Sequence, residues 1–175
     1  MLKRGTQKRY LAEFVYGSTD GTVTTFAVVA GAMGASIGSV IVLILGFANL
    51  FADGFSMAVS NYLAMKSENE IYIKHRHSHY KDPKKTALVT FFSFVMLGFI
   101  PLIPFILATF FPTLIIYQFK LAIILTAITF LFIGAIKGEV VGKHFVKSSI
   151  ETLVVGGIVA TIAFFVGYLL RVIIV

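Results

Sequence analysis

The sequence has no cysteine and no tryptophan, and few of its residues are charged. The absence of cysteine excludes disulfide frameworks, thiolate zinc sites and cysteine nucleophiles. Charged residues make up 13% of the 175 positions, and 58% are hydrophobic. An ordinary soluble domain has about 25% charged residues. Together with a mean hydropathy of +0.92, these proportions exclude such a domain and indicate an integral membrane protein.

Five segments are candidates for crossing a bilayer, which requires about 20 mostly apolar residues. We therefore expect an all-α membrane protein with five transmembrane helices and a single domain over residues 1–175. The expected helices cover residues 11–33, 37–65, 86–110, 118–136 and 152–174, and residues 66–85 are expected to form a short cytoplasmic loop. Pro101 and Pro104 lie within the third segment and predict a kink in it.

Positive charge is distributed unevenly between the two ends of these segments. The chain has 15 Lys and Arg against 8 Asp and Glu, a formal net charge of +7. Thirteen of the 15 lie before the first segment or after the second and fourth, and Lys120 and Arg171 lie on the other side. The positive-inside rule then predicts a cytoplasmic N-terminus and an outer C-terminus. The excess charge is an orientation signal, so we expect no nucleic-acid partner.

The first two segments differ from the others because each contains an acidic residue, Asp20 or Asp53. An ionised side chain at the centre of a bilayer costs about 3 kcal/mol or more, so such residues indicate a functional site. Polar or soft residues recur at a spacing of four in each segment: Tyr16, Asp20 and Thr24 in the first, and Asn49, Asp53 and Met57 in the second. Two such faces placed opposite each other would offer oxygen ligands and one thioether. That combination favours Fe²⁺, with Mn²⁺ and Co²⁺ compatible.

Simpler explanations compete with this hypothesis. Asp20 follows Gly17, Ser18 and Thr19 and would also serve to cap a helix that starts at Gly21. The amides of Asn49 and Asn61 are typical of hydrogen bonds between membrane helices. Met57 alone would be read as a core residue, and only its register with Asp53 marks it out.

Small residues are frequent in the first two segments and predict close helix contacts. Gly17 with Gly21, and Ala48 with Ala52, have the spacing that lets helix backbones approach each other. The contact is either within the chain or with a second copy. Because five helices leave little room to enclose an ion path, we expect a homodimer.

Further metal-ligating side chains occur in the expected cytoplasmic loops, where they would line the mouth of a path. They are Glu68, Glu70, His75, His77, His79 and Glu139. The competing explanation for the histidines is a solvated basic loop, because alternate residues share a face only in an extended strand and neighbouring Lys and Arg repel a cation. Glu139 has Lys137 as a nearby candidate partner.

The residues of the first two segments resemble a known family. The stretch EFVYGSTDGTVTTFAVVAGAMGAS, followed by ILGFANLFADGFSMAVSNYLAMKSE, is similar to the first two helices of the vacuolar iron transporter family. The resemblance implies a five-helix homodimer that exchanges cytosolic Fe²⁺, and often Mn²⁺, for protons. Its path would be lined by the first two helices of both subunits.

The resemblance also assigns residues. The family's first-helix aspartate falls on Asp20 and its second-helix methionine on Met57, and Asp53 and Asn49 share the face of Met57. Well-known plant members insert a glutamate-rich cytoplasmic metal-binding domain between the second and third helices, where this chain has only residues 66–85. The resemblance therefore does not extend to a cytoplasmic metal-buffering step.

The sequence thus predicts a secondary transporter that exports Fe²⁺ or Mn²⁺ from the cytosol in exchange for protons. The expected metal ligands are Asp20, Met57, Asp53 and Asn49, with Asp20 and Asp53 also carrying the protons. We expect no bound cofactor and no catalytic residue. The alternatives are a passive divalent-cation channel, a structural subunit, or an intramembrane aspartyl protease, although neither aspartate lies in a GxGD context. Without an organelle-targeting presequence, a prokaryotic plasma membrane is expected, or a vacuolar-type membrane in a eukaryote.

Overall fold

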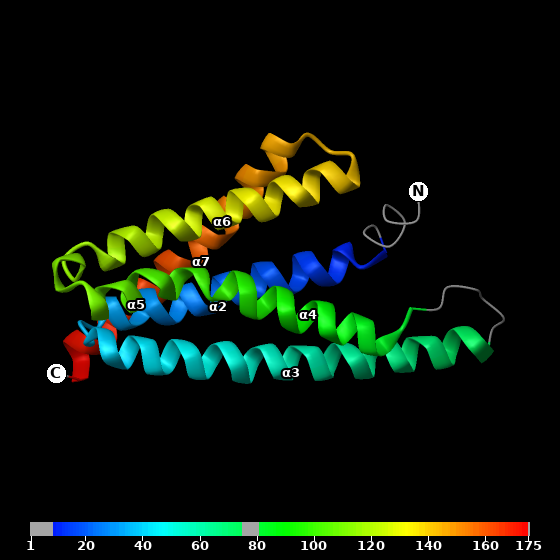
Figure 1. Cartoon of the computed structure of the whole chain (residues 1–175), viewed down its shortest axis with the longest axis horizontal. Coiled ribbons are helices and arrows are strands. Elements are labelled where there is room, and N and C mark those ends of the chain that lie inside the picture. Colours follow the sequence, from blue (N-terminus) through cyan, green and yellow to red (C-terminus); the bar gives the residue numbers. More distant parts are fainter. Residues whose placement is uncertain (1–8, 75–80, 175) are drawn as a thin grey trace.

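The computed structural model describes residues 9–74 and 81–174, and all regular secondary structure in these ranges is helical. In chain order the elements are α2 (Leu11–Gly34), α3 (Ser39–Lys74), α4 (Pro83–Gly98), η1 (Ile100–Leu102), α5 (Ile103–Phe110), η2 (Pro112–Leu114), α6 (Gln118–Val141) and α7 (Phe145–Ile174). The segments α4, η1 and α5 together form the expected third helix. The long helices lie side by side as an elongated bundle (Figure 1). The predicted all-α architecture of five long helical segments is confirmed over the described residues.

Four of these segments are long and apolar enough to span a bilayer, counted over the described residues: Ser39–Ile71, Pro83–Phe110, Gln118–Val141 and Phe145–Ile174. The chain is therefore a multi-pass integral membrane protein. The helix α2 has 24 residues and a length of about 36 Å, which exceeds the hydrocarbon thickness of about 30 Å. Its composition is more polar, but it lies lengthwise among the apolar helices (Figure 1). Its polar side chains are therefore held at the depth of the bilayer.

The close contacts of α2 depend on glycine. A Cβ atom on Gly21 would overlap the carbonyl oxygen of Phe94 in α4, and one on Gly34 would overlap that of Phe164 in α7. A Cβ atom on Gly167 of α7 would overlap the carbonyl oxygen of Gly31. The glycines of α2 therefore serve packing within the chain, which decides between the two explanations given above for their spacing.

The structure differs from the expected loop at residues 66–85. The helix α3 continues to Lys74, because the segment SENEIYIK contains no proline or glycine to end it. The helix α4 then begins at Pro83, where the side chain of Asp82 accepts a hydrogen bond of 2.9 Å from the backbone N–H of Lys84. With 36 residues, α3 is about 54 Å long, so it extends beyond the bilayer.

The connection between α6 and α7 is also shorter than expected. The helix α6 ends at Val141, and Gly142 follows with a positive φ of 75°, the left-handed conformation that commonly ends a helix. The helix α7 begins at Phe145 instead of residue 152. The polar residues that suggested a loop therefore lie in the first turns of α7.

The helix is interrupted at the prolines, where a kink is predicted. The helix α4 ends at Gly98, and the backbone N–H of Leu102 then bonds to the carbonyl of Phe99 at 3.0 Å, a three-residue spacing. The helix resumes as α5 at Ile103. The missing N–H groups of Pro101 and Pro104 account for this interruption.

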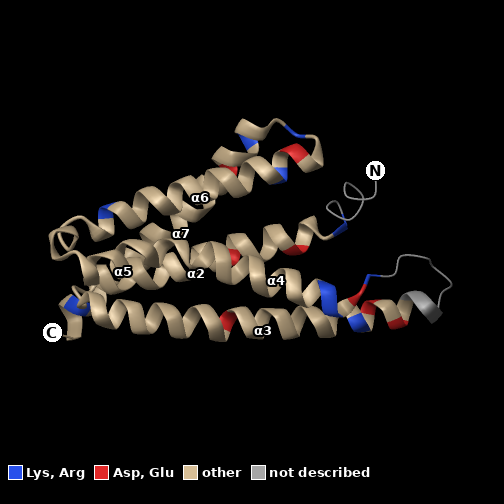
Figure 2. Cartoon of the chain, viewed as in Figure 1, with Lys and Arg blue, Asp and Glu red and all other residues tan. Residues whose placement is uncertain are grey.

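Charged residues gather mainly toward one end of the bundle, where α2 begins, α3 ends and α6 turns into α7 (Figure 2). This distribution is what the positive-inside rule uses to assign orientation. The orientation itself stays a prediction.

Because the chain lacks cysteine, single cysteines can test the orientation. We expect Ser67→Cys on the extension of α3 to react with a membrane-impermeant maleimide only from the cytoplasmic side. Thr113→Cys, between α5 and α6, should react only from the outer side. Both positions are exposed. The reverse pattern in oriented vesicles would show that the orientation is wrong.

The tight contact of α2 with α4 predicts that Gly21→Ala destabilises the protein by about 1–3 kcal/mol, a typical range for overpacking. The matched control is Gly157→Ala in α7, where an added Cβ has no neighbour within 4 Å. Thermal unfolding in detergent should show a lower midpoint for Gly21→Ala and an unchanged or higher one for Gly157→Ala. Equal midpoints for the two variants would contradict the packing described.

Candidate metal site between α2 and α3

Asp20 lies in the middle of α2, which runs without interruption from Leu11 to Gly34. Because the helix is continuous here, Asp20 is not the N-cap of a helix that starts at Gly21. The neighbouring hydroxyl groups are bonded within the helix, since Thr22 donates to the carbonyl of Ser18 and Thr24 to that of Asp20, both at 2.8 Å. The partly buried Asp20 carboxyl group is therefore left as the charged group of this face.

Asp53 lies well inside α3 and is also partly buried. It lies on the helix next to α2, and its charge acts on the carboxyl group of Asp20. The structure thus brings together acidic side chains of two neighbouring helices. Like charges in a low-dielectric environment favour the binding of a cation or of protons between them.

The other two predicted ligands are on the same helix as Asp53. Met57 is partly buried and packs against the apolar core, so its position fits the core interpretation as well as the ligand interpretation. The Nδ2 atom of Asn49 is buried and makes no hydrogen bond to the residues that the structure describes. Asn61 instead donates to Thr90 in α4 at 2.6 Å. An interhelical hydrogen bond of the expected kind is therefore found for Asn61 and not for Asn49.

A cavity of about 750 Å³ lies on another side of Asp20, between α2, α6 and α7. Its polar lining comes from these three helices: Tyr16, Thr19, Asp20, Lys137, Glu151 and Thr152. The Nζ atom of Lys137 is 3.7 Å from Glu151 Oε2, so Lys137 pairs with Glu151 and not with its other candidate partner, Glu139. Glu151 was not among the expected site residues, because it lies in the loop expected before residue 152. The only signal for it is an acidic residue next to an apolar segment.

The expected residues of the cytoplasmic mouth are dispersed. Glu68, Glu70 and Glu139 are each exposed, and His75, His77 and His79 lie outside the described residues. Residues 9–74 and 81–174 contain no group of three or more His, Asp or Glu side chains that could hold a metal ion. Over these residues, one copy therefore holds acidic side chains on two contacting helices and does not assemble a complete ligand set.

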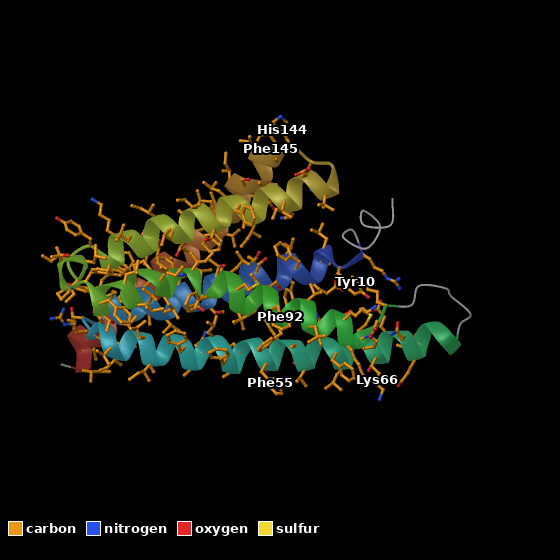
Figure 3. All side chains as sticks on the ribbon, in the orientation of Figure 1. Tyr10, Phe55, Lys66, Phe92, His144 and Phe145 are labelled. Carbon is orange, nitrogen blue, oxygen red and sulfur yellow. The ribbon has the colours of Figure 1, made fainter. Side chains whose placement is uncertain are left out.

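One face of α3 is exposed along the length of the helix. It carries small residues at a spacing of four: Ala48, Ala52, Ser56, Ser60 and Ala64. Large apolar side chains flank them, among them Phe55, which is 66% exposed and points away from the bundle (Figure 3). Asn49, Asp53 and Met57 each follow one of these small residues in the sequence, so they lie at the edge of the exposed face.

The fold and these side chains define an all-helical, multi-pass membrane protein with a partly buried carboxyl group on each of two contacting helices. Comparison with known proteins then gives the family. A family model described as the VIT family matches residues 11–82 and 73–168. The chain belongs to the VIT family.

Several relatives are similar along most of this chain. A vacuolar iron transporter of Toxoplasma gondii is 26% identical over 97% of the chain and 77% of its own length. A vacuolar iron transporter of Plasmodium berghei is 26% identical over 94% of the chain and 83% of its own length. Vacuolar iron transporter 1 of Arabidopsis thaliana is 24% identical over 94% of the chain and 89% of its own length.

The lengths of these alignments show that the chains differ in length. The alignment with the Toxoplasma relative covers 232 residues, more than the 175 of this chain, so that relative has residues without a counterpart here. The two segments of the family match meet at residues 73–82, which connect α3 to α4.

Proposed function

We propose that this protein exports Fe²⁺ or Mn²⁺ from the cytosol in exchange for protons. Its membership of the VIT family and the naming of its relatives as vacuolar iron transporters support metal transport. The observation that carries the proposal is that the contacting helices α2 and α3 each hold a partly buried carboxyl group, Asp20 and Asp53. In a membrane bundle, such a pair favours a bound cation or bound protons.

Metal export is coupled to proton uptake if Asp20 and Asp53 bind either the metal or protons, but not both at once. A bound divalent metal neutralises both carboxylates, and its release leaves two like charges that take up protons. Protons that bind from the outer side neutralise the metal-free site, so that it can face the cytosol again. An inward proton gradient therefore drives metal outward. The thioether of Met57 biases the site toward softer first-row ions such as Fe²⁺.

The proposed path lies between two copies of the chain. The small residues on the exposed face of α3 have the spacing typical of close contacts between membrane helices. Pairing this face with the same face of a second copy would bring two Asp53 and two Met57 side chains toward one axis. The incomplete ligand set of one copy would then be completed by the other.

The first test is metal flux into proteoliposomes under a proton gradient. We expect Asp20→Asn to lower Fe²⁺ flux by at least about tenfold, since even outer-shell partners of metal sites cost about 10–100-fold in affinity or activity. Met57→Ala should lower the flux less, because it removes one neutral ligand.

Matched controls distinguish these effects from changes in folding. Asp82→Asn keeps a side chain that caps α4, and Met96→Ala changes a methionine that is 67% exposed. Both should retain wild-type flux. Undiminished transport in Asp20→Asn would contradict the mechanism, and wild-type flux that ignores the proton gradient would identify a passive channel.

The proposed dimer predicts a specific cross-link. A single cysteine at Ala52 on the exposed face of α3 should form an intermolecular disulfide under mild oxidation in the membrane. The control is Val166→Cys, at an exposed position of α7, and should stay monomeric. A dimer through this face is wrong if Ala52→Cys and Ser56→Cys both remain monomeric, or if Val166→Cys cross-links equally well.

A further inference from the structure

An ion pair between a buried carboxylate and a partly exposed lysine joins the start of α2 to the residues before α4. The Nζ atom of Lys81 is 2.8 Å from Glu13 Oε1, and Glu13 is only 5% exposed. The second carboxylate oxygen, Oε2, is also buried and has no hydrogen-bond partner among the described residues. The Lys81 ammonium group thus binds one of the two oxygens of a buried carboxylate.

The same lysine contacts the cytoplasmic extension of α3. The Nδ2 atom of Asn69 donates a hydrogen bond of 2.7 Å to the backbone carbonyl of Lys81. Asn69 is 5% exposed, and its Oδ1 atom is buried without a hydrogen-bond partner among the described residues. Two elements, α2 and α3, therefore each place an unpaired side-chain oxygen next to the segment that contains Lys81.

These unpaired oxygens have the chemistry of a cation site. Leaving a buried acceptor unsatisfied is unfavourable, more so when it is charged. Carboxylate and amide oxygens are also usual ligands of divalent cations. A lysine is a single point charge and cannot satisfy both carboxylate oxygens as the forked side chain of an arginine does. The cluster thus contains more acceptor capacity than its resident cation uses.

The cluster also lies on the approach to Asp20. Glu13 precedes Asp20 by seven residues, which is about two turns and about 10 Å along α2. Residues seven apart share a face of a helix. A cation held at Glu13 would therefore lie two turns from Asp20, on the same face of α2.

We propose that Glu13 and Asn69 form a binding site for a divalent cation in which the Lys81 ammonium group acts as a tethered competitor. An incoming metal ion displaces Lys81 from Glu13 and takes up the unpaired oxygens. When the metal moves on toward Asp20, Lys81 returns to the carboxylate. The placement of this site on a transport path rests on the function proposed above, whereas the competition between metal and lysine does not.

Equilibrium binding of Mn²⁺ to the purified full-length protein in detergent tests the competition, with free Mn²⁺ measured by electron paramagnetic resonance. We expect Lys81→Gln to bind Mn²⁺ about tenfold more tightly, since a hydrogen bond to a charged group no longer has to be broken. Lys84→Gln removes an equal charge from an exposed position of α4 and should bind like the wild type. The double variant Glu13→Gln, Lys81→Gln should lose the gain.

A second measurement on the wild-type protein avoids any effect of substitution on folding. Displacement predicts that Mn²⁺ increases acylation of Lys81 by an amine-reactive reagent, detected by mass spectrometry, without increasing that of Lys84. Unchanged Mn²⁺ affinity in Lys81→Gln, or Lys81 acylation that is insensitive to Mn²⁺, would overturn the proposal. Neither readout needs a proton gradient, so absence of metal flux in proteoliposomes would refute the transport function alone.

Discussion

Close contact between the backbone of α2 and its neighbours holds this bundle together. Apolar burial drives helix association weakly inside a bilayer, because the lipid is as apolar as the side chains. The glycines of α2 let α4 and α7 approach to distances at which a methyl group would overlap a carbonyl oxygen. These contacts supply dispersion attraction, and they also shield α2 from lipid on several sides.

That shielding explains the unusual composition of α2. A helix that faces lipid must be apolar, whereas α2 carries serine, threonine and aspartate at the depth of the bilayer. Its hydroxyl groups bond to carbonyls of the same helix, which lowers the cost of burying them. Asp20 has no such partner within α2, and its charge is instead influenced by Asp53 from α3. The packing of α2 thus positions the acidic pair on which the proposed exchange depends.

The fold was largely predictable from the sequence, because apolar length and the placement of lysine and arginine report directly on the bilayer. The ends of α3 and the start of α7 were not, since polarity marks where a helix leaves the membrane and not where it stops being helical. The helix faces that carry Asp20 and Asp53 were visible, because polar residues recur on each of them at a spacing of four. The pair Glu13–Lys81 was not visible, because its residues are far apart in the sequence, and the pair Lys137–Glu151 was not visible, because Glu151 lay in an expected loop. Asn49 and Asn61 looked alike in the sequence, and only the structure shows that Asn61 donates a hydrogen bond to a neighbouring helix and that the Nδ2 atom of Asn49 does not.

Anomalous scattering from a crystal of this protein soaked with Mn²⁺ tests the central claim most directly. The account predicts an anomalous peak at the level of Asp20, within coordination distance of the carboxylate of Asp20 or Asp53 and near the thioether of Met57. A crystal whose metal peaks lie only at exposed carboxylates outside the bundle would contradict it.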